Sequence, residues 1–179
     1  DGADGAAMNP ADASPTFYGK YRGTVENPAA LQGIGRIQVS VPGVLGDGTL
    51  AWAMPCLPGA GPGVGFYAIP PKGAKVWVEF EGGNPDYPIW SGGFWDLGDT
   101  PAPPGPVGFL TKAWKGENFS LEIFDIPGAP TLALELTTAM GPAKIEADPT
   151  GLTITHGAST VKLAIDGVSI NGANLKILP

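Results

Sequence analysis

The stretch KVWVEFEGGNPDYP, residues 75–88, is the most informative part of this sequence. Its first six residues place Val76, Val78 and Phe80 on one side and alternate them with Lys75, Trp77 and Glu79. A period of two is typical of a β-strand with one buried face. The Gly-Gly-Asn-Pro that follows predicts a turn. A strand and a tight turn are therefore the unit on which this part of the chain is built.

Similar runs lie on both sides of this stretch. They cover residues 18–25, 34–41, 50–54 and 88–94. In the second run, Ile37, Val39 and Val41 share one face. Five short strands at this spacing predict a small closed barrel, and closure removes the exposed sheet edges. We expect an all-β fold that begins with this barrel.

The second half of the chain, residues 113–178, also alternates, but its strands are shorter and recur about every ten residues. Turn signals such as Asp166-Gly167 and Asn171-Gly172 separate them. A lone meander of such strands is marginally stable. Each aliphatic side chain that it fully buries contributes about 1.5–3 kcal/mol. Three chains around one axis would bury these faces, so we expect a homotrimer.

The chain divides into four expected parts. These are an N-terminal arm (1–16), the barrel (17–95), a Pro-rich linker (96–112) and a shaft (113–179). The four prolines of the linker favour an extended, semi-rigid path. The N-terminal residues carry neither a basic nor an apolar region, so no signal peptide is expected.

Composition narrows the function classes. The net charge is −7, and the ten basic residues form no cluster, so nucleic acid is not expected as a partner. No run of 18 apolar residues predicts a membrane span. The single cysteine excludes an intrachain disulfide. Because Cys56 lies among apolar residues, we expect a buried, inert thiol.

The order of the segments resembles a known family. The segments that carry the resemblance are YGKYRGTV (18–25), GRIQV (35–39), WAMP (52–55), GAGPG (59–63), IPPKG (69–73) and VWVEFEGGNPDYP (76–88). The family is that of the central spike proteins of contractile injection systems. It includes phage baseplate spikes and the spike part of the type VI valine-glycine repeat proteins.

The resemblance implies a fold and a function. The barrel would be an oligosaccharide/oligonucleotide-binding (OB) fold, three copies of which dock beneath a trimeric baseplate hub. The shaft would be an intertwined trimeric β-helix that is pushed through the target cell envelope on contraction. The protein would belong to a virion tail baseplate or to an injection particle assembled in the cytoplasm. The chain has no tandem His-x-His, so a separate tip cap of the PAAR type is implied.

Candidate interface residues lie on the barrel. Trp77 falls on the face opposite Val76 and Val78, and an exposed aromatic side chain favours a protein interface. The alternative is a small secondary core covered by a loop. Three residues in the segments of the resemblance are also expected at an interface: Tyr18, Arg36 and Trp52.

The only histidine, His156, is the one candidate metal ligand. It shares its parity with Leu152 and Ile154, so three imidazoles in a trimer could hold an axial cation. The simpler interpretation is a solvent-facing turn residue beside Gly157. We expect no metal and no cofactor.

Two other functions stay open. One is an OB module that binds a sugar or single-stranded nucleic acid, although the basic groove is missing. The other is a tail-associated cell-wall hydrolase that uses Asp86, Asp96 and Asp99; solvated turn residues are the simpler interpretation of these acids. The glycine-rich run 59–65 precedes β-like residues rather than the helix of a phosphate loop, and a close turn is expected there. We expect no enzymatic activity.

Overall fold

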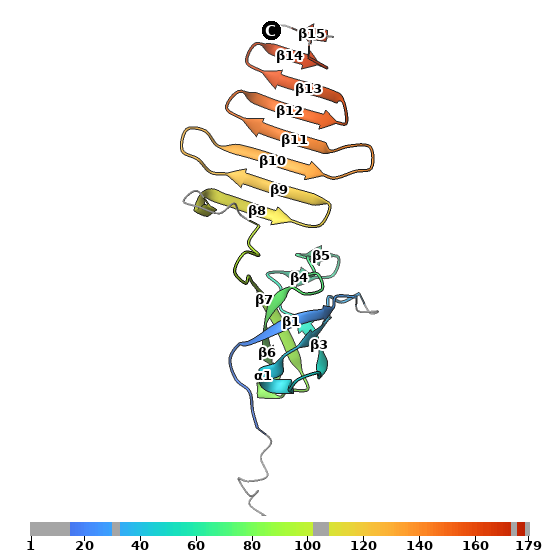
Figure 1. Ribbon diagram of the computed structural model, residues 1–179, viewed down its shortest axis with the longest axis vertical. Helices are drawn as coiled ribbons and strands as arrows, with labels where there is room; N and C mark the ends of the chain where they lie inside the picture. The colour runs from blue at the N-terminus through green and yellow to red at the C-terminus, as the bar shows by residue number, and fades with distance from the viewer. Residues whose placement is uncertain (1–14, 30–32, 102–107, 173–174, 178–179) are drawn as a thin grey trace, which may run out of the picture. The chain divides into compact units, whose positions relative to one another are not determined.

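The structure is a computed structural model that describes residues 15–29, 33–101, 108–172 and 175–177. The chain forms two compact units, residues 1–98 and 99–179. In both units the regular secondary structure is almost entirely β-strand (Figure 1). The expected all-β fold class is confirmed.

The first unit contains a closed barrel with the strand order β1-β2-β3-β7-β6. Its strands are β1 (Tyr21–Asn27), β2 (Ile37–Ser40), β3 (Leu50–Pro55), β6 (Lys75–Phe80) and β7 (Pro88–Phe94). All neighbours are antiparallel except β3 and β7, which pair in parallel. Five strands closed in this way confirm the predicted OB-type barrel.

The barrel interior is filled by the side chains that the alternation predicted. Its fully or nearly fully buried members are Val25, Ile37, Val39, Val41, Ala53, Val76, Val78, Phe80 and Trp90. The one polar atom of Trp90, Nε1, donates a hydrogen bond to the Gly35 carbonyl oxygen at 3.1 Å. A buried indole N–H without a partner would be destabilising, so this bond allows the largest side chain to occupy the core.

Short elements connect the barrel strands. They are the helix α1 (Pro42–Leu45), the 3₁₀ turn η2 (Glu81–Gly83) and the strands β4 (Ala60–Gly61) and β5 (Val64–Gly65). The glycine-rich run forms the β4–β5 hairpin. A side chain at Gly65 would come within 2.6 Å of the Gly59 carbonyl oxygen, and its φ of +146° also favours glycine. The run is thus a turn with close backbone contact, but the sequence did not predict the two strands.

The prediction for Cys56 is wrong, because its thiol is exposed. Its backbone N–H donates to the Trp90 carbonyl at 2.9 Å and prolongs the contact between β3 and β7. The inward residue of this segment is Ala53, which has the opposite parity. Because residues on both faces of this strand are apolar, the sequence did not show which of them point into the barrel.

The second unit is an eight-stranded antiparallel sheet in which each strand pairs with the next one along the chain (Figure 1). After the 3₁₀ turn η3 (Gly108–Leu110) its strands are β8 (Thr111–Lys115), β9 (Phe119–Phe124), β10 (Thr131–Leu136), β11 (Ala143–Asp148), β12 (Gly151–His156), β13 (Ser159–Ala164), β14 (Gly167–Ile170) and β15 (Leu175–Ile177). The expected linker 96–112 overlaps β8, and its residues 102–107 lie outside the described ranges, as do residues 1–14 of the arm.

The turn between β11 and β12 is held by one carboxylate. Asp148 Oδ1 accepts hydrogen bonds from the Thr150 hydroxyl and N–H, both at 2.6 Å, and from the Gly151 N–H at 3.2 Å. The Thr150 hydroxyl is the main reason why the pKa of Asp148 is lowered. Asp148 therefore links the stability of this hairpin to pH.

Ile37→Ala should lower the free energy of unfolding of the barrel by about 2–5 kcal/mol, because it leaves a cavity at a fully buried position. Urea unfolding followed by tryptophan fluorescence measures the change. Gln38→Ala, the next position on the outer side of β2, is the control and should change stability by less than about 0.5 kcal/mol. Equal effects of the two substitutions would contradict the assigned core.

Asp148→Asn should lower the thermal midpoint of the shaft at pH 7. The folded carboxyl has the depressed pKa, so its carboxylate stabilises the fold above the ordinary aspartate pKa of about 3.9. That contribution is lost as the pH falls through the folded-state pKa. The midpoints of the two proteins should therefore converge in acid. A constant gap between them from pH 7 to pH 2 would refute the role of this carboxylate.

Candidate interaction surfaces

The register of the shaft sheet places its apolar side chains on one side. Leu134, for example, pairs with Leu121 on β9 and with Ile145 on β11, and Ile145 pairs with Ile154 on β12. We call this side the apolar face; its members are Trp114, Phe119, Leu121, Ile123, Leu132, Leu134, Leu136, Ala143, Ile145, Ala147, Leu152, Ile154, Val161, Leu163, Val168, Ile170 and Leu175.

The opposite side of the same sheet is polar. It carries Lys115, Glu122, Glu135, Lys144, Glu146, Thr153, Thr155, Lys162 and Ser169. Lys144 Nζ forms an ion pair with Glu135 Oε2 at 2.9 Å. The hydrogen bond that the Lys144 ammonium donates to Glu135 is the main cause that raises the pKa of Lys144. Lys115 forms an ion pair with Glu122 on the same side. The charged and hydroxyl side chains of this side can stay hydrated.

Nothing in the described part of the second unit forms a layer over the apolar face. As a result, large side chains in the middle of the sheet stay exposed: Leu134 by 37% and Ile154 by 44%. Monomeric soluble proteins rarely expose a continuous apolar surface of this kind, and such a surface marks an interaction site. The apolar face is therefore the main candidate site.

The apolar face narrows along the chain. Strands β9 to β13 have six residues each, β14 has four and β15 has three. One outer column of cross-strand neighbours runs Phe119, Leu136, Ala143, His156, Ser159. Its side chains change from apolar on β9 to β11 to polar on β12 and β13, where the column ends. The width of the sheet and of its apolar face therefore decreases toward β15.

His156 lies in this outer column. It is exposed, it ends β12, and its cross-strand neighbours are Ala143 and Ser159. The column next to it, which holds Ile154, runs through the middle of the sheet. Within the described residues of one chain, no group of three or more His, Cys, Asp or Glu could hold a metal ion. The exposed position fits a solvent-facing residue, and the alternative of an axial cation held by three copies of His156 stays untested.

On the barrel, Trp77 points outward as its alternation predicted. Its ring lies 4.7 Å from that of Phe94, and the Arg22 guanidinium carbon is 5.1 Å from the Trp77 ring centroid and 4.6 Å from that of Phe94. Trp77 is thus half-buried by its own chain, through strand residues rather than a loop. The cation–π stack leaves a flat, partly apolar outer surface.

The other three expected interface residues occupy two places. Arg36 and Trp52 lie together, because Arg36 Nη2 donates to the Trp52 carbonyl oxygen at 3.1 Å. Tyr18 is 71% exposed and approaches Gly83. No contact joins either place to Trp77 among the described residues, so the four do not form one cluster.

The barrel carries a further apolar surface, of which the sequence predicted only Trp52 as an interface residue. In β3 the small Ala51 and Ala53 pair with the buried Val39 and Ile37. The larger side chains face outward, next to an outward residue of β7; these four, Leu50, Trp52, Met54 and Ile89, we call the β3 stripe. The sequence LAWAM (50–54) contains no polar residue, so both faces of this strand are apolar. This pattern could have indicated an outward apolar surface.

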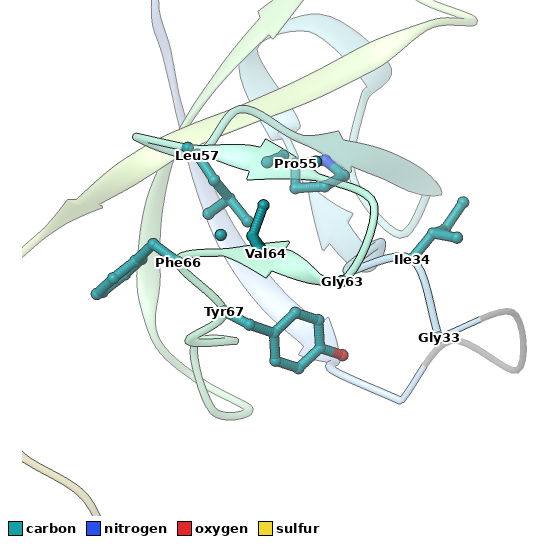
Figure 2. Close-up of a pocket in the computed structure, with 12 residues that line it drawn as sticks. Gly33, Ile34, Pro55, Leu57, Gly63, Val64, Phe66 and Tyr67 are labelled. Carbon is teal, nitrogen blue, oxygen red and sulfur yellow. The ribbon is translucent and has the colours of Figure 1, made fainter.

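The β3 stripe ends at a pocket of about 490 Å³ beneath the β4–β5 hairpin (Figure 2). Its main side chains are Ile34, Pro55, Leu57, Val64, Phe66 and Tyr67, with glycines completing the lining. None of its lining residues is charged. Pro55, which lines the pocket, directly follows Met54 of the stripe, so the pocket lies at the end of β3 where the stripe ends.

The acids considered for hydrolysis are exposed and do not line this pocket. Asp86 lies in the turn before β7, and its N–H donates to Asn84 Oδ1 at 3.0 Å. Asp96 is 4.0 Å from Lys75 Nζ. Asp99 begins the second unit. These positions fit solvated turn residues.

None of the helices in the described ranges has the length and apolar content to span a membrane.

Comparison with known families accounts for both units. The type VI secretion system/phage-baseplate injector OB domain matches residues 21–95, and the phage baseplate V C-terminal trimerisation domain matches residues 115–176. A comparison with curated proteins found no match. The two matched ranges follow the barrel and the shaft sheet and cover more than three quarters of the chain. The chain therefore belongs to the family of baseplate spike proteins of phage tails and type VI secretion systems.

Proposed function

We propose that three copies of this chain form the central spike of a contractile tail or injection particle. The apolar face is the observation that carries the proposal. Three such faces, turned toward one axis, would cover one another and leave the polar sides in water. The match to a trimerisation domain supports three copies rather than two.

The shaft would transmit force. Its backbone ladders run between neighbouring strands of each chain, and packing of the apolar faces would add side-chain contacts between chains. Burial contributes about 1.5–3 kcal/mol for each large aliphatic side chain. With several such residues per chain, the assembled shaft would resist bending and unfolding. The intertwining of the three shafts stays a prediction.

The two ends of the chain would serve different partners. The barrel would dock to the trimeric hub, and the outer surface around Trp77 and Arg22 offers aromatic and cationic groups for a contact between copies of the chain. Within the described residues, β15 is the last strand at the narrow end of the shaft sheet, and its edge residue Leu175 is 51% exposed. A separate tip cap of the PAAR type would cover this edge. On contraction the spike would cross the target envelope as a mechanical, non-enzymatic element.

Ile154→Asp should abolish the trimer at micromolar concentration. Three carboxylates would enter the shaft axis, where burial of an unpaired charge is strongly unfavourable, and three isoleucine contacts would be lost. Sedimentation equilibrium measures the mass. Thr155→Asp is the matched control, since it adds the same charge one residue away on the polar side, opposite Lys144. A monomeric parent protein, or equal dissociation by both variants, would refute the proposal.

Trp77→Ala should weaken assembly, because it removes the ring that Arg22 and Phe94 stack on. The expected change is a lower trimer stability on dilution, measured by mass photometry. Tyr87→Ala, an exposed aromatic in the turn before β7, is the control. A Trp77→Ala trimer as stable as the parent would argue against an interface at this position.

A further inference from the structure

The pocket beneath the β4–β5 hairpin has the chemistry of a protein contact. Its side chains are aliphatic or aromatic, and three of them are largely exposed: Val64 by 73%, Tyr67 by 65% and Phe66 by 49%. Figure 2 shows Val64 and Leu57 on its hairpin side and Ile34 on the opposite side. A lining without charge favours an apolar occupant.

The adjoining β3 stripe is apolar as well. Leu50 is 43% exposed and Met54 45%, although both belong to a barrel strand whose inner side is already filled by alanines. One barrel therefore presents two apolar surfaces at the same end of β3. The pocket is concave, and the side chains of the β3 stripe project from the barrel.

A cyclic trimer needs two such surfaces. Its contacts are heterologous, so each subunit meets one neighbour with one patch and the other neighbour with a different patch. In a ring of three, the directions to the two neighbours differ by about 60°, so the two patches must be neighbours on the subunit. The β3 stripe and the pocket meet this condition.

The occupant that the chain itself supplies is a second copy. The trimerisation domain (115–176) follows the barrel along the same chain, so three barrels would be tethered at high effective concentration. We propose that, in the trimer, the β3 stripe of one barrel packs into the pocket of the next copy. This inference rests on the proposed trimeric function and adds the contact that sets the barrels in register.

The single cysteine provides a probe for this contact. Cys56 is not a lining residue of the pocket, but it lies between two that are, Pro55 and Leu57, and two residues after Met54 of the β3 stripe; its thiol is exposed in one chain. Packing of a second barrel there would cover the thiol. A thiol reacts more slowly when it is covered, so the labelling rate of Cys56 reports the contact without any added group.

The experiment measures the reaction of Cys56 with a disulfide reagent in the full-length protein, together with sedimentation and unfolding midpoints. Val64→Asp changes the pocket and Leu50→Asp changes the stripe. Each should stay trimeric through the shaft, remain folded at the labelling temperature and label at least about tenfold faster than the parent, because the local contact is opened. Tyr87→Asp, outside both surfaces, should label like the parent.

The outcomes separate this inference from the proposed function. A parent trimer whose Cys56 reacts as fast as that of Val64→Asp would overturn the barrel contact and leave the trimer intact. A change caused by Tyr87→Asp as large as that caused by Val64→Asp, or no change in Leu50→Asp, would also overturn it. A monomeric parent would overturn both.

Discussion

The constraint on which the structure depends is that one side of the shaft sheet must be kept from water. The sheet is a single layer whose polar and apolar residues are separated by the pleat. A one-residue shift in register would move the whole set to the wrong side. The ladder from Leu121 through Leu134 and Ile145 to Ile154 keeps that register over four strands. The need for copies of the same chain follows from this separation.

The barrel meets its own hydrophobic requirement internally. Nine residues fill its interior, and Trp90 joins the core because its N–H reaches Gly35. The apolar surface that the core does not bury comprises the β3 stripe, the pocket and the stacked Trp77. The two units therefore differ in kind, since one is complete without copies and carries additional apolar surface, whereas the other is incomplete without them.

Alternation along the chain was enough to predict much of this fold. The inward faces of β2 and β6 were identified from Val39 and Val78, because a period of two leaves one choice once one side is apolar. The same rule failed at β3 and Cys56, where both sides are apolar and parity cannot be assigned. The pocket was missed for another reason: its walls come from residues 33–34 and 55–67, and only the folded hairpin brings them together.

Pairing of each shaft strand with the next along the chain has a consequence for how the spike is made. Almost all contacts in this sheet are local, and chains of low contact order fold fast, hairpin by hairpin. Each shaft would then complete its backbone bonds before it meets its partners, and the slow, concentration-dependent event would be the docking of three finished sheets. Newly made chains would expose their apolar faces in that interval, so the docking of three copies would compete with aggregation.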